Sequence, residues 1–190
     1  MKKYELTKET TNIFGKTLHR IRATRDFSNV HAGDLGGFIE NELNLSHDRD
    51  TWVYGNAWVY GEARAYGNAW AYGEARVSGN ALVSGDARVG GRALVSGNAL
   101  VYGNALVKGT RDIYWISCIG SRDGTTTFFR NANNGISVSC GCFYGTIDEF
   151  AAAVTKTHGD NEHAQAYRHA IEIGHVNRET QRKTTGFWEE

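Results

Sequence analysis

The chain has 190 residues, which is enough for one good-sized domain or two small ones. Its 21 Lys and Arg residues balance its 21 Asp and Glu residues, so no net field draws it to nucleic acid or to an anionic membrane. No run of about 18 apolar residues is present, and the opening MKKYELTKETTNIFG lacks the apolar core of a secretory signal. Three cysteines, an odd number confined to residues 118–142, do not suit a disulfide framework. We therefore expect a cytoplasmic protein with neither a membrane nor a nucleic-acid partner.

Residues 1–34 are predicted to form a β-rich cap. Within this segment KTLHRIRAT indicates a strand, and three arginines accompany it, Arg20, Arg22 and Arg25. Two interpretations of these arginines stay open. They are either solvated edge residues that discourage the addition of another strand, or one wall of a binding pocket.

A glycine at every sixth position, from Gly55 to Gly109, dominates the next part of the chain. Alanine stands two residues after each of the first nine of these glycines, and valine or alanine stands two residues before each of them. Alternation within a strand sends these small residues to one face and the variable residues to the other. Glycine suits a corner that needs a positive φ. A period of six matches no helical stripe, so the repeat predicts a solenoid with three units per coil.

In this pattern, residues 35–111 resemble the hexapeptide-repeat proteins, whose fold is a left-handed parallel β-helix. The in-phase stretch LGGFIE predicts one further coil upstream, through NELNLS and HDRDTW. The expected fold is therefore mainly β, a left-handed parallel β-helix with an N-terminal β cap and a C-terminal α+β domain.

The best-known proteins of the hexapeptide class are acyltransferases, which usually work as trimers and carry a histidine base on the coils. None of the seven histidines lies between residues 52 and 111. The carboxylates of Glu62, Glu74 and Asp86 are the other bases available there, and we expect them to be solvated corners. We therefore expect no enzyme and no catalytic residue, with an acyltransferase-like enzyme kept as an alternative.

Nearly the whole chain is also similar to small proteins of phages and prophages, in which a β-rich cap, a GDLGGFIE joint, a hexapeptide prism and a compact domain follow one another. The phrases that carry this resemblance are KYELTKETTNIFGKTLHRIRATRDF, HAGDLGGFIENELNLS and GSRDGTTTFFRNANNGISVSCGCFYGTIDEF. The resemblance implies an accessory protein made in infected or lysogenised bacteria that acts on the host. It implies no particular activity.

Counting by 18 stacks the outward side chains into three faces, with aromatic residues on the early coils and leucines on the later ones. We expect these rings to point away from the core, Trp52 among them, which leaves a large apolar surface on a monomer. One interpretation is self-association into a homo-oligomer, with a trimer favoured. The other is a ligand that stacks on the rings and meets nearby arginines. The candidate residues for that ligand are Trp58, Tyr60, Arg64, Tyr66, Trp70, Tyr72, Arg76 and Arg88.

Residues 112–179 are predicted to form a small α+β domain, followed by a polar tail over residues 180–190. Three strands are expected, in RDIYWISCIG, in TTTFFR at 125–130 and in ISVSCGCF at 136–143. A capping box in TIDE starts a helix that ends at Gly159. A second helix is expected over residues 160–177.

The turn GSRDGTTT combines glycine, hydroxyl groups and arginine, which together can hold a phosphate or carboxylate. A plain hairpin turn is the competing interpretation. Zinc binding or a Cys–His nucleophile is compatible with the residue types of Cys118, Cys140, Cys142 and the helical histidines, but no spacing fixes either, so we expect no metal and no cofactor. The candidate ligand-binding residues here are Ser121, Arg122, Thr125, Thr126 and Arg130.

These features together predict a non-enzymatic, homo-oligomeric accessory protein that binds a small anionic ligand. The sharper hypothesis is that it sequesters a nucleotide-derived signal used in host immunity. The alternatives are a structural or assembly trimer, a module that binds a host protein, and the acyltransferase-like enzyme.

Overall fold

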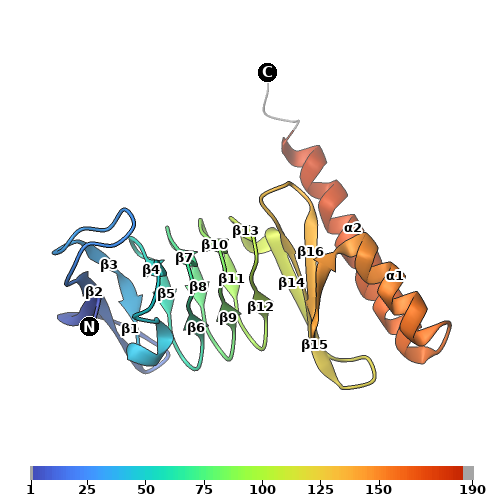
Figure 1. The fold of residues 1–190 in the computed structure, drawn as a ribbon, viewed down its shortest axis with the longest axis horizontal. Coiled ribbons are helices and arrows are strands. Elements are labelled where there is room, and N and C mark those ends of the chain that lie inside the picture. Colours follow the sequence, from blue (N-terminus) through green and yellow to red (C-terminus); the bar gives the residue numbers. More distant parts are fainter. Residues whose placement is uncertain (1, 186–190) are drawn as a thin grey trace. The chain divides into compact units, whose positions relative to one another are not determined.

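The computed structural model describes the backbone of residues 2–185 and the side chains of residues 2–176. The chain divides into two compact units, Met1–Asp112 and Ile113–Glu190 (Figure 1). The N-terminal unit contains both the cap and the solenoid, and the C-terminal unit contains a sheet with two helices. In the described part of the chain, no helix has the length and apolar character needed to span a membrane.

The cap begins with an antiparallel hairpin of β1 (Tyr4–Ile13) and β2 (Lys16–Ala23). β3 (Leu35–Ile39) pairs antiparallel with β2 on one side and parallel with a solenoid strand on the other. The predicted strand in KTLHRIRAT is thus confirmed as β2. The cap continues directly into one sheet of the solenoid, in the order β1-β2-β3-β5-β8-β11.

The solenoid consists of two-residue parallel strands that stack at intervals of 18 residues, as in the pairs Trp52–Trp70, Trp58–Arg76 and Arg64–Leu82. Besides the sheet shared with the cap, it forms the sheets β13-β10-β7-β4 and β12-β9-β6. The predicted parallel β-solenoid with three faces is confirmed. Its strands are β4 (Trp52–Val53), β5 (Trp58–Val59), β6 (Arg64–Ala65), β7 (Trp70–Ala71), β8 (Arg76–Val77), β9 (Leu82–Val83), β10 (Arg88–Val89), β11 (Leu94–Val95), β12 (Leu100–Val101) and β13 (Leu106–Val107).

Alanine and valine fill the interior of the solenoid. From Ala57 to Val107 every inward residue of the repeat is at most 3% exposed. The corner glycines from Gly55 to Gly103 have φ between +56° and +71°, a backbone conformation that costs a residue with a Cβ about 1–2 kcal/mol. At Gly79 an added Cβ would also lie 2.8 Å from the backbone nitrogen of Gly97 on the adjacent coil. Glycine therefore provides both the turn and the close approach of successive coils.

The predicted upstream coil is present, formed by β3, a bridge of Leu45 to Ala65, and β4. The cap closes this end of the solenoid with polar contacts to its backbone. The buried Lys3 Nζ donates to the carbonyl oxygens of Thr51 (2.6 Å) and Arg49 (3.2 Å), and Tyr4 Oη donates to that of Leu45 (2.7 Å). Backbone groups at the end of the solenoid therefore find partners inside the cap.

The C-terminal unit is an antiparallel meander followed by two helices, which confirms the predicted α+β domain. Its strand order is β14-β15-β16-β17. Thr146 and Glu149 form the predicted capping box, and Gly159 ends the first helix as expected. The elements are β14 (Ile113–Ile119), β15 (Gly124–Arg130), β16 (Ile136–Cys140), β17 (Phe143–Thr146), α1 (Ile147–His158) and α2 (Glu162–Thr185).

Two predicted boundaries in this unit are wrong. The single strand expected over residues 136–143 is a hairpin, because Gly141 takes a φ of +57° and reverses the chain between β16 and β17. The second helix passes residue 177 and includes the start of the expected polar tail, because residues 178–185 contain good helix formers and neither proline nor glycine. Phe187 and Trp188 lie outside the described residues.

Candidate functional site

The outward rows of the solenoid are largely engaged with one another. The 18-residue register stacks the Arg76 guanidinium on the Trp58 ring, with Cζ 4.6 Å from the ring centroid, and Arg88 on Trp70 at 4.8 Å. These distances are typical of cation–π contacts. The four side chains that were expected to meet a ligand therefore contact each other along the solenoid.

The expectation that Trp52 lies on the open surface is wrong. Its side chain is 1% exposed and packs edge-on against Tyr4 and Phe27, with ring centroids 6.2 and 5.3 Å apart. The cap covers this part of the first face, so the early aromatic residues are cap contacts as well as solenoid residues. Tyr54, for example, donates a hydrogen bond to Asn29 Oδ1 at 2.7 Å.

Two tyrosines among the candidates are half-buried packing residues. Tyr72 lies against Gly90, where an added Cβ would be 1.9 Å from Tyr72 Cζ. The missing side chain at Gly90 therefore makes room for the Tyr72 ring. Tyr60 is half-buried in the row that continues with the buried Ser78.

The third face is the one that keeps candidate residues together and accessible. Arg64, Tyr66 and Leu82 line a shallow groove of about 370 Å³, together with Leu43 and Ser46. Tyr66 is 44% exposed. This groove is compatible with either a ligand or another protein surface.

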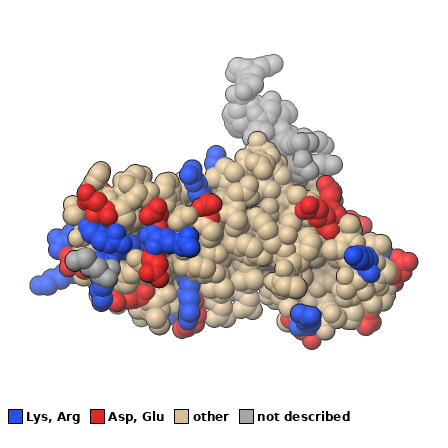
Figure 2. Space-filling view, in the orientation of Figure 1, with Lys and Arg blue, Asp and Glu red and all other residues tan. Residues whose placement is uncertain are grey.

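The cap arginines have internal partners. Arg20 Nε pairs with Glu9 Oε1 at 2.8 Å, its Nη1 donates to the Gly36 carbonyl at 2.8 Å, and its guanidinium lies over the Phe38 ring. Arg22 pairs with Glu5. These contacts favour the edge interpretation over a pocket wall. On the face in Figure 2, positive and negative side chains intermix over the N-terminal unit and form no broad patch of one sign.

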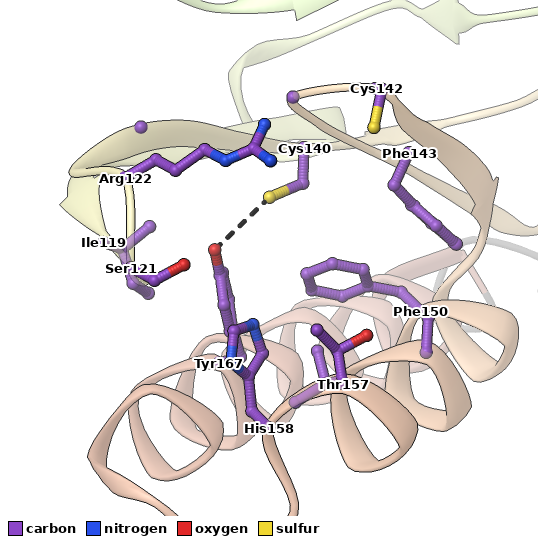
Figure 3. A pocket seen from close by; sticks show the side chains of 14 residues that line it. Ile119, Ser121, Arg122, Cys140, Cys142, Phe143, Phe150, Thr157, His158 and Tyr167 are labelled. Atoms are coloured by element: carbon purple, nitrogen blue, oxygen red, sulfur yellow. Dashed lines mark hydrogen bonds between the residues drawn. The ribbon is translucent and has the colours of Figure 1, made fainter.

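A pocket of about 270 Å³ lies within the C-terminal unit (Figure 3). The β14–β15 turn, the β16–β17 turn, α1 and α2 all contribute to its wall. Its apolar side carries Phe143, Phe150 and Val154, and its polar side carries Ser121, Arg122, Cys140, Cys142, Thr157, His158 and Tyr167. In Figure 3 the side chains of Arg122, Cys140 and Tyr167 converge on the same space.

The Cys140 sulfur has two hydroxyl neighbours. The buried Thr126 Oγ1 donates to Sγ at 3.1 Å, and Tyr167 Oη lies 3.5 Å from the same atom. Burial raises the pKa of Tyr167, and its hydrogen bond with Cys140 raises the pKa further. The Tyr167 hydroxyl therefore stays protonated and available as a donor at neutral pH.

Two glycines shape this polar wall. Gly120 has a φ of +79°, and an added Cβ there would lie 1.9 Å from Tyr167 Oη. The tyrosine hydroxyl thus reaches the sulfur only because residue 120 has no side chain. Gly141 turns the chain so that Cys140 and Cys142 both line the pocket from either side of the hairpin.

Arg122 places a positive charge at the edge of the pocket. The half-buried His158 also lines the pocket, and no Asp or Glu is among its described lining residues. The His158 ring packs beside Tyr167, with centroids 5.8 Å apart. Nowhere in the described part of the chain do three or more His, Cys, Asp or Glu side chains group as metal ligands would. The site therefore suits an anion with an apolar portion.

Some of the candidate residues in and after the predicted turn line the pocket, and others do not. Ser121 and Arg122 line the pocket, and Thr126 supports it through Cys140. Thr125 and Arg130 do not line this pocket: Thr125 Oγ1 bonds Ser117 Oγ at 2.9 Å, and Arg130 stands at the far end of β15. Sequence reasoning missed Tyr167, Phe143 and Phe150 as site residues, because no local pattern shows that these distant segments meet around one pocket.

The comparisons with known proteins concern the scaffold. The family described as the YdcK beta solenoid repeat matches residues 75–91 and 93–109, which lie within the coils and outside the pocket. No curated protein matches the chain. The matched segments and the parallel stacking at 18-residue intervals identify a β-solenoid repeat protein.

Proposed function

We propose that the C-terminal unit binds a small anionic ligand, without chemical turnover, in the pocket between its two turns and its helices. One observation carries this proposal. The pocket combines the Arg122 guanidinium with an apolar floor, and no carboxylate is among its described lining residues. A guanidinium at a partly apolar site favours carboxylate or phosphate oxygens, and the Ser121 hydroxyl adds a further donor.

The size of the pocket narrows the ligand class. Its volume of about 270 Å³ lies just below the usual range of roughly 300–1,000 Å³ for ligand pockets. The ligand is therefore a small metabolite or a mononucleotide, with its flat or apolar part on the rings of Phe143 and Phe150 and its anionic group at Arg122. A dinucleotide would extend out of the pocket.

A more specific proposal joins this pocket to the resemblance with phage and prophage proteins. In that context the protein is a cytoplasmic accessory protein of a bacterial host that sequesters a nucleotide-derived signal of host immunity. Support comes from the sequence phrases given above and from the anion-binding character of the pocket. An acyltransferase-like activity has less support, because no histidine lies between residues 52 and 111 of the solenoid.

The test is a binding panel of inorganic phosphate, 5′- and cyclic mononucleotides and ADP-ribose, measured by thermal shift and by calorimetry. We expect one class to stabilise the protein and Arg122→Gln to remove that effect. Arg130→Gln is the matched control, because Arg130 does not line the pocket. The proposal is wrong if no anion binds, or if both variants weaken binding equally.

We further propose that the protein self-associates through the third solenoid face, as a trimer. The supporting observation is the groove of Arg64, Tyr66 and Leu82, since aromatic residues and arginine are enriched in protein contacts. Native mass spectrometry of Leu82→Glu should report loss of the oligomer, with Leu94→Glu on the second face as control. A wild-type monomer contradicts this proposal without affecting the pocket.

A further inference from the structure

We propose that the pocket is a covalent binding site, in which the Cys140 thiol adds to the carbonyl carbon of a small anionic aldehyde or 2-oxo acid. This inference rests on the proposed anion-binding function, because Arg122 is the group that holds the carboxylate or phosphate of that ligand. The ligand class includes 2-oxo acids and the open-chain form of a ribose phosphate.

The arrangement around the sulfur supports this chemistry. Cys140 Sγ lines the pocket, with the Thr126 hydroxyl donating to it at 3.1 Å and Tyr167 Oη at 3.5 Å. Figure 3 places the Arg122 guanidinium on the same side of the pocket as this sulfur. The thiol therefore has two hydroxyl neighbours that orient it, and the pocket that it lines carries a cation that attracts an anionic reactant.

The addition needs no group that the site lacks. The Sγ–C bond forms, the π bond of the carbonyl opens, and the thiol proton moves to the former carbonyl oxygen, which gives a hemithioacetal or hemithioketal. No leaving group departs and nothing is oxidised or reduced. Tyr167 Oη lies 3.5 Å from the sulfur. In the adduct the former carbonyl oxygen is bonded to the carbon next to this sulfur, so Tyr167 is placed to donate a hydrogen bond to that oxygen.

Cys140 differs from the other two thiols in its surroundings. Cys118 is exposed and does not line the pocket. Cys142 lines the pocket on the other side of Gly141, but it is exposed. The chain thus contains two internal references for the reactivity of Cys140.

The experiment measures the rate at which iodoacetamide labels each cysteine, by peptide mass spectrometry, with glyoxylate or glycolate present. Glyoxylate has a carboxylate and an aldehyde, whereas glycolate has the same carboxylate and an alcohol. We expect glyoxylate to slow labelling of Cys140 about tenfold relative to Cys118, the ratio that about 1.4 kcal/mol produces. Glycolate should slow it less than twofold. Arg122→Gln should remove the protection, and Arg130→Gln should keep it.

A second measurement follows the adduct directly. With carbon-13 glyoxylate, wild-type protein should give the carbon signal of a hemithioacetal, and Cys140→Ser should not. The melting temperature of Cys140→Ser verifies that the variant is folded. If glyoxylate and glycolate protect equally and Cys140→Ser binds glyoxylate as tightly as wild type, the covalent inference fails and anion binding stands. If neither compound protects Cys140 but an anion of the binding panel still binds, the covalent inference alone fails. If no anion of the panel binds either, both proposals fail.

Discussion

The Arg88 guanidinium lies over the indole of Trp70, with Cζ 4.8 Å from the ring centroid, because the two residues are partners in adjacent coils. Arg88→Ala should therefore lower the free energy of unfolding by about 0.5–1 kcal/mol, the range for an accessible cation–π contact. Denaturant unfolding measures this change. Arg92→Ala is the control. The side chains of Arg92 and its ion-pair partner Glu74 are 86% and 65% exposed, so this pair should contribute almost nothing to stability. Equal losses in the two variants contradict the cation–π assignment.

Substitution of two corner glycines separates backbone strain from coil spacing. Gly55 and Gly79 both have positive φ, but a Cβ at Gly55 meets no atom closer than 3.8 Å, whereas at Gly79 it meets Gly97 at 2.8 Å. Gly55→Ala should lose about 1–2 kcal/mol from the left-handed conformation alone. Gly79→Ala should lose more, since adjacent coils must also separate. Thermal unfolding compares the two, and the account is wrong if Gly55→Ala is the less stable variant.

Gly120→Ala should disrupt the pocket while leaving the C-terminal unit folded. The added Cβ would overlap Tyr167 Oη, so the ring must move and lose its contact with Cys140. We expect ligand binding to fall at least as far as in Tyr167→Phe. Gly159→Ala shares the positive φ but meets no atom within 4 Å, so it should change stability and not affinity. Calorimetric titration of both variants decides the matter.

Two buried tyrosines and one half-buried tyrosine should make stability fall at alkaline pH. Burial raises the pKa of Tyr4, Tyr114 and Tyr167 above the ordinary value of 10.0. Because the folded pKa exceeds the unfolded one, their contribution is complete below pH 10 and decreases as the pH rises beyond it. In an alkaline titration followed by phenolate absorbance at 295 nm, these three tyrosines should accordingly ionise after the others, and only when the protein unfolds. A single transition near pH 10 in folded protein would contradict this.

The interior of the solenoid was predictable because one local rule governs it. Period six with alternating small residues and corner glycine determines the strands, the 18-residue stacking and the buried alanine and valine positions. The left-handed sense of the coil stays a prediction. The phage context, the trimer and the ligand also stay predictions.

The surroundings of Trp52 and the pocket were less accessible to sequence reasoning, for two physical reasons. The stacking rule gives the direction of an outward side chain but not what covers it, so the packing of Tyr4 and Phe27 on Trp52 was not foreseen. The pocket depends on a reversal at Gly141 inside an apolar run and on Tyr167, a core residue whose hydroxyl emerges at the wall. Neither feature has a periodic signal.

The stacked coils have a consequence for how their alignment is fixed. Every unit presents the same small residues inward, so removal of one six-residue unit, such as residues 86–91, would bring Val95 into the place of Val89 and leave the interior filled. On the outside the same slip would replace Arg88 with Leu94 beside Trp70. Packing of the hydrophobic interior is therefore the same in the correct alignment and after a shift of one unit. The outward side chains select the correct alignment of the coils.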